Sequence, residues 1–78
     1  MDEDLARILA TGGSAASREL TRLYDLLLLH LPEDEALRSG VASALAEVGL
    51  NVVRPAFEAY PDLEAEFDRR VQRYGTTT

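Results

Sequence analysis

The stretch Ser17–Leu31, SRELTRLYDLLLLHL, decides the fold class of this chain. Its apolar side chains recur at every third or fourth residue, which is the spacing of one face of an α-helix. This stripe consists of Leu20, Leu23, Tyr24, Leu27 and Leu31. The second half of the stretch is apolar almost all round, because three leucines lie outside the stripe: Leu26, Leu28 and Leu29.

A helix that is apolar on every side is normally buried on every side. We therefore expect a central helix that is wrapped by neighbouring helices. The alternative is that Leu26 and Leu29, away from the main stripe, face a second copy of the chain or a partner protein. The uninterrupted apolar run Leu26–Leu29 is far shorter than the ~20 residues that a membrane-spanning helix needs.

A short helix is predicted before the central one, over Asp2–Ala10, with Leu5, Ile8 and Leu9 as its apolar stripe. The pair Gly12-Gly13 is expected to end it, because glycine readily adopts the left-handed conformation that closes helices. Ser14 or Ser17 would then cap the central helix.

Three helices are predicted after the central one, and each contains or follows a proline. They cover Pro32–Val48, Pro55–Ala59 and Pro61–Tyr74, with Leu50–Val53 expected as a connector. In the last of them Leu63, Phe67, Val71 and Tyr74 form a single apolar stripe. Gly49 and Gly75 are expected to end the helices that precede them.

A chain of 78 residues is long enough for one domain, and its core must be efficient or shared with a partner. We expect an all-α fold, a compact bundle of four to five short antiparallel helices over residues 1–75. Thr76–Thr78 should form a disordered tail.

The composition and charge of the chain disfavour or exclude several classes of function. The net charge of −6 disfavours nucleic acid, whose phosphates attract basic surfaces. There are no cysteines, which excludes disulfides, thiolate nucleophiles and cysteine zinc sites. The acidic N-terminus is unlike a secretory or mitochondrial leader. We expect a cytoplasmic protein that binds neither membrane nor nucleic acid.

No arrangement of residues predicts catalysis, a metal or a cofactor. His30 is the only histidine, so we interpret it as structural in the last turn of its helix. An acid at every second position resembles the start of a calcium loop, but the glycine that such a loop needs is missing. These acids are Asp62, Glu64, Glu66 and Asp68. We therefore expect a protein that is not an enzyme.

The first hypothesis is a non-catalytic protein–protein interaction domain for recruitment or self-assembly, as a terminal module of a larger protein. The last predicted helix has acids first and arginines last, a pattern suited to docking on an oppositely charged surface. The expected contacts join Arg69, Arg70 and Arg73 to acids among Asp2, Glu3, Asp4, Glu33, Asp34 and Glu35. Leu26 and Leu29 would add apolar contact. By architecture alone this reading is compatible with death-fold-type adaptors.

Other functions remain open. The chain could be a docking domain of a multienzyme assembly. It could also be a small helical regulator that binds an apolar ligand in a pocket lined by Leu26, Leu29, Phe57 and Phe67. A helix-turn-helix around Pro32 is disfavoured, because the acidic start of its second helix would repel phosphate.

Overall fold

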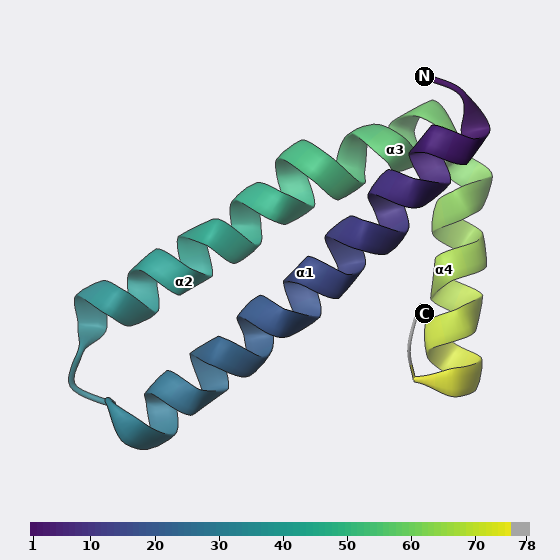
Figure 1. Ribbon diagram of the computed structural model, residues 1–78. Helices are drawn as coiled ribbons and strands as arrows, with labels where there is room; N and C mark the ends of the chain where they lie inside the picture. Colours follow the sequence, from purple (N-terminus) through teal and green to yellow (C-terminus); the bar gives the residue numbers. More distant parts are fainter. Residues whose placement is uncertain (76–78) are drawn as a thin grey trace.

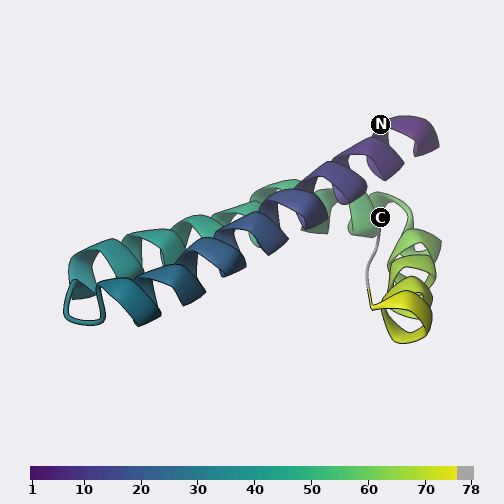
Figure 2. The same ribbon diagram turned by 60° about the horizontal axis from the view of Figure 1, so that its bottom comes forward.

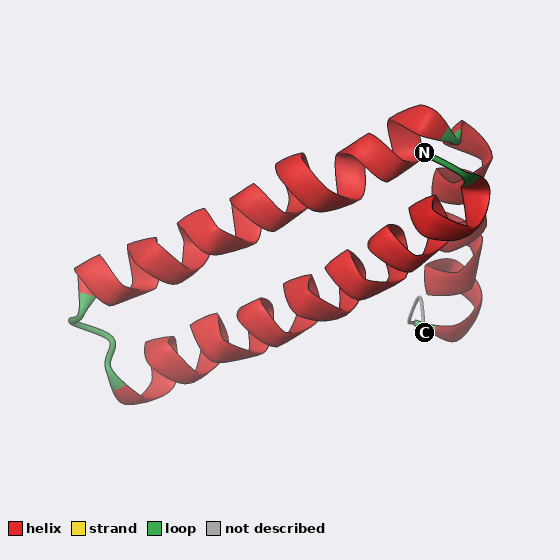
Figure 3. Ribbon diagram, turned by 45° about the horizontal axis from the view of Figure 1, so that its top comes forward, coloured by secondary structure: helices red, strands yellow, loops and turns green. Residues whose placement is uncertain are grey.

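The computed structural model describes residues 1–75, which form three helical rods (Figure 1). The first rod is α1, Glu3–His30. The second consists of α2 (Glu35–Val48), the π-helical turn η1 (Gly49–Val53) and α3 (Arg54–Ala59), which follow one another directly. The third is α4, Pro61–Tyr74. Figure 3 shows that the described residues contain helix and loop only.

α1 and the second rod form a long antiparallel hairpin, and α4 lies across one end of it (Figure 1). We call that end, where the start of α1 meets α3 and α4, the proximal end, and residues 14–48 the distal hairpin. Figure 2 shows that α4 lies on one side of the layer formed by the two rods of the hairpin. The molecule measures 43 × 26 × 14 Å, so it is elongated and flattened.

The all-α class is confirmed, but the compact bundle of four to five short helices is not. The predicted break at Gly12-Gly13 is wrong, because α1 runs through both glycines. A side chain on Gly13 would meet Val52 and Val53 of the second rod, so this glycine permits close approach of the helices. Neither Ser14 nor Ser17 is a cap. Asp2 caps α1 by accepting from the Leu5 amide at 2.7 Å.

The predicted connector Leu50–Val53 is also wrong, since this segment lies within the π-helical turn. Pro55 lacks an amide hydrogen and its ring crowds the carbonyl four residues earlier in an α-helix. Here the amide of Arg54 donates to the carbonyl of Gly49, a wider π-type turn. The wider turn accommodates Pro55, and the rod continues through the position where Gly49 was expected to end it.

The three remaining predictions of helix position are closer to the structure. α3 begins at Arg54, one residue before the predicted start, and ends at Ala59 as predicted. α4 has the predicted bounds, and Gly75 ends it in the left-handed conformation, with φ 73°. α2 begins three residues later than expected, because Pro32 lies in the loop. Its N-cap is Asp34, whose carboxylate accepts from the Leu37 amide at 3.0 Å. Thr76–Thr78, predicted as a disordered tail, lie outside the described residues.

The core is small and lies entirely at the proximal end. Its buried apolar members are Ala6, Ala10, Ala56, Leu63 and Phe67. Leu9, Phe57 and Tyr60 pack against it, and the rings of Phe57 and Phe67 meet edge to face at 5.5 Å. The expectation that the central helix is wrapped on all sides is wrong, because no residue between 14 and 55 is buried.

Candidate protein-interaction surface

The distal hairpin exposes leucines that no other element of residues 1–75 covers. Half-buried residues such as Tyr24, Leu27 and Leu45 occupy the seam between the two helices. Outside that seam the hairpin exposes Leu23, Leu26, Leu28, Leu29, Leu31 and Leu37, and Leu29 reaches 73% exposure. We call these six residues the distal leucine surface. These leucines lie on both flanks of the hairpin, and exposed apolar surface of this extent usually marks a binding site.

A second set of exposed apolar residues lies on the proximal half of α1. Leu5 and Ile8 were predicted to belong to the apolar stripe of a short first helix, and they are 45% and 67% exposed. Sequence reasoning missed them as surface residues because it treated the start of α1 as a separate short helix. In one continuous α1 they share a side of the helix with Leu23 and Leu26, since 18 residues make about five full turns.

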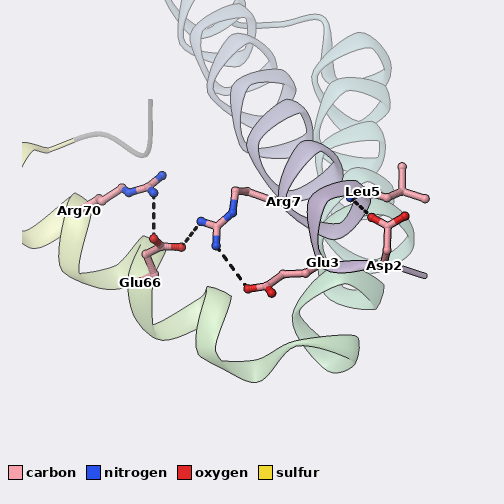
Figure 4. Close-up of polar contacts among 6 residues, drawn as sticks. All are labelled: Asp2, Glu3, Leu5, Arg7, Glu66 and Arg70. Carbon is pink, nitrogen blue, oxygen red and sulfur yellow. Dashed lines mark hydrogen bonds and ion pairs between the residues drawn. The ribbon is translucent and has the colours of Figure 1, made fainter.

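A polar network fixes α4 on a different side of α1 (Figure 4). Arg7 donates a hydrogen bond from Nη1 to Oε2 of Glu66, and Arg70 donates from Nη2 to Oε1 of Glu66 at 3.1 Å. Arg7 also lies 3.6 Å from the carboxylate of Glu3. The hydrogen bond from Arg7, together with the charge of Arg70, lowers the pKa of the Glu66 carboxyl.

The three predicted docking arginines lie on the C-terminal half of α4, and two of them make contacts within the chain. Arg70 pairs with Glu66 and its guanidinium stacks over the Phe67 ring at 5.2 Å. Arg73 stacks over the ring of Tyr74 at 5.3 Å. Arg69 is exposed. This cluster therefore stabilises α4 as well as presenting positive charge.

The predicted acidic partners divide between the two ends of the molecule. Glu33, Asp34 and Glu35 lie at the distal loop, where Asp34 caps α2. Asp2, Glu3 and Asp4 lie at the proximal end, where Asp2 caps α1 and Glu3 pairs with Arg7. The arginines of α4 and the distal acids are thus at opposite ends of the hairpin (Figure 1). Within one copy of the chain they do not meet.

The apolar pocket predicted from four residues is not assembled within one copy. Phe57 and Phe67 belong to the proximal core, whereas Leu26 and Leu29 lie near the distal loop. A depression between α3 and α4 is lined by Phe57 together with Val53 and Pro61, and it does not include the other three predicted residues.

The remaining polar candidates have ordinary structural positions. His30 is exposed in the last turn of α1. The alternating acids lie along α4, and within residues 1–75 no three His, Cys, Asp or Glu side chains converge as a metal site would require. In the same range, no helix combines the length and apolar character needed to cross a bilayer.

Comparison with known proteins finds no matching family model, no similar curated protein and no similar solved structure. The geometry of the described residues is therefore the basis for a functional proposal.

Proposed function

We propose that this chain is a non-catalytic protein–protein interaction module that binds through the exposed apolar sides of its helical hairpin. One observation carries the proposal: residues 14–55 contain no buried residue, while the distal hairpin exposes six leucines. Two helices packed side by side bury only the seam between them. Further helices supplied by another protein surface would bury the rest.

The free-energy argument supports the same conclusion. Burying a leucine side chain is favourable by roughly 1.5–3 kcal/mol, so the distal leucine surface leaves several kcal/mol of hydrophobic free energy unused in one isolated copy. The net stability of a small domain is itself only about 5–15 kcal/mol. A partner that covers this surface would therefore change the stability of the hairpin substantially.

The proposal covers recruitment of another protein and self-assembly alike, including docking within a multienzyme assembly. The elongated hairpin gives no support to the architectural comparison with death-fold-type adaptors. It also gives none to an internal apolar-ligand pocket, since the residues expected to line that pocket lie at opposite ends of the molecule.

Amide hydrogen exchange on the dilute chain, shown to be monomeric by sedimentation, tests the proposal. Regions with few buried contacts open at low free-energy cost. We expect amides of the distal hairpin to exchange at least about tenfold faster than those of residues 6–13, which pack in the proximal core. Residues 6–13 serve as the internal control, because they belong to the same helix. A monomer whose distal hairpin is as well protected as residues 6–13 would contradict the proposal, because such a hairpin needs no partner.

A further inference from the structure

α1 carries an exposed apolar face on which the spacing of the apolar residues is the same in both chain directions. Leu5 and Ile8 form a pair near its start, and Leu23 and Leu26 form a pair with equal spacing near its end. At about 100° per residue, all four lie within an arc of about 60°. All four are at least one-third exposed. Between the two pairs this face carries small residues, Gly12, Ala15 and Ala16.

Within residues 1–75, α4 leaves this face uncovered. Arg7 reaches Glu66 of α4, whereas the next residue, Ile8, points about 100° further round the helix. Gly12 lies near the middle of the face, and a Cβ added there would meet nothing within 4 Å. Glycine inside a helix is about 1 kcal/mol less favourable than alanine, and no contact among residues 1–75 explains its presence.

We propose that α1 packs antiparallel against α1 of a second copy, in a dimer with two-fold symmetry centred between Ala15 and Ala16. This inference rests on the proposed function and names its partner. In this register Leu5 lies opposite Leu26 of the other copy, and Ile8 lies opposite Leu23. A two-fold interface must be self-complementary, and the mirrored spacing of these residues meets that condition.

The only charged residue near the middle of the face also fits this register. Glu19 lies opposite Gly12 of the second copy, where the missing side chain leaves space. Its carboxylate is already held by Arg22, whose Nε donates to both carboxylate oxygens at 3.1 Å. The glutamate therefore keeps its ionic partner when the face is covered.

The antiparallel direction follows from the helix dipoles and from the mirrored register. The first turn of α1 and its cap carry Asp2, Glu3 and Asp4, and the last turn carries His30. A parallel pair would place the two acidic starts side by side, which is repulsive, and would align the two helix dipoles in the same direction. The antiparallel pair opposes the two dipoles, and it places each acidic start near the distal loop of the other copy, which carries Glu33, Asp34 and Glu35.

The amount of exposed surface favours a second copy of this size. The chain has 5322 Å² of accessible surface, whereas a compact monomer of this length exposes about 4,700 Å². The excess of about 600 Å² approaches the ~800 Å² that each partner buries in a standard interface. The radius of gyration is 14.1 Å, whereas a compact domain of this length has a radius of gyration of about 11–12 Å. Pairing two flat hairpins face to face would give a bundle of ordinary thickness.

Single cysteines test the register directly, because the chain has no cysteine of its own. Under mild oxidation we expect Ala16→Cys, close to the two-fold axis, to form a disulfide-linked dimer. Leu5→Cys alone and Leu26→Cys alone should stay unlinked, but a mixture of the two should cross-link. Self-linking of Leu5→Cys would show a parallel pair and overturn the proposal.

Sedimentation equilibrium with matched variants tests the face itself. Leu26 and Leu28 have similar exposures, 40% and 43%, but point to opposite flanks of α1, about 160° apart. We expect Leu26→Gln to weaken dimerisation by at least about tenfold and Leu28→Gln by less than about threefold. Circular dichroism should show unchanged helix content in both. Equal effects of the two variants would overturn the proposal.

Salt dependence separates this dimer from one built by the α4 arginines. Each copy carries a net charge of −6, so added salt should strengthen an apolar dimer or leave it unchanged. A dimer held by contacts between arginines and acids would weaken in salt instead, and that result would overturn the proposed face.

A chain that stays monomeric at millimolar concentration would also overturn the proposed dimer. The proposed function would survive that outcome if the distal hairpin of the monomer still exchanged rapidly.

Discussion

The two ends of this molecule use the same kind of sequence and reach different degrees of burial. At the proximal end, three helical rods meet, and small residues such as Ala6, Ala10 and Ala56 are completely buried beside Phe67. In the distal hairpin, two rods meet, and large residues such as Leu29 stay exposed. Burial in this chain therefore depends on the number of neighbouring helices more than on the hydrophobicity of the residues.

The largest expected contrast between the two ends comes from removing one apolar side chain from each. Phe67→Ala should lower the free energy of unfolding by about 3–5 kcal/mol, because it leaves a cavity among packed residues. Leu29→Ala, at an exposed position, should change it by less than about 0.5 kcal/mol in the monomer. Urea denaturation followed by circular dichroism at low protein concentration measures both values. Similar losses for the two variants would show that the core extends into the distal hairpin.

The second contrast compares two adjacent glycines. A Cβ on Gly13 would lie 2.5 Å from Cγ2 of Val53 and 3.3 Å from Cγ1 of Val52, and valine is stiff about its first side-chain torsion. Gly13→Ala should therefore destabilise the monomer by about 1–3 kcal/mol through overpacking. Gly12→Ala is the matched control, and it should stabilise the monomer by up to about 1 kcal/mol. Thermal unfolding of both variants checks the pair. A stable Gly13→Ala protein would mean that the rods are not held in close contact there.

These contrasts also show which features the sequence could predict. The bounds of α4 follow from its regular apolar spacing and from Pro61 and Gly75 at its ends. Each of those signals acts within a few residues of the helix it defines. The same local reasoning failed at Gly12-Gly13, where the decisive contact is with Val52 and Val53, about forty residues away in the sequence.

The candidate surface was only partly predictable for a related reason. Leu26 and Leu29 were recognised as surplus to one apolar stripe, and both are exposed. The pairing of the Leu5 and Ile8 positions with Leu23 and Leu26 depends on α1 being one helix. Once a break was assumed at the two glycines, the five-turn relation between the pairs had no structural meaning. An error in one helix boundary thus concealed a whole face.

The smallest expected contrast concerns the ion pairs, and it depends on pH. Arg7 and Arg70 lower the pKa of Glu66 in the folded chain, so the folded state favours the ionised carboxylate. The resulting stabilisation is present above the ordinary carboxyl pKa of about 4.3 and is lost as the pH falls through the lower folded value. Glu66→Gln should lower the free energy of unfolding at pH 7 by up to about 1 kcal/mol, since the network is partly exposed.

The loss caused by Glu66→Gln should shrink as the pH is lowered from about 5 to about 3, because protonation removes the same charge from the natural chain. Glu64→Gln, on an exposed acid of the same helix, is the control and should show a weaker pH dependence. A loss for Glu66→Gln that is equal at both pH values would assign the contribution of Glu66 to packing, and the attachment of α4 would then depend on the apolar core alone.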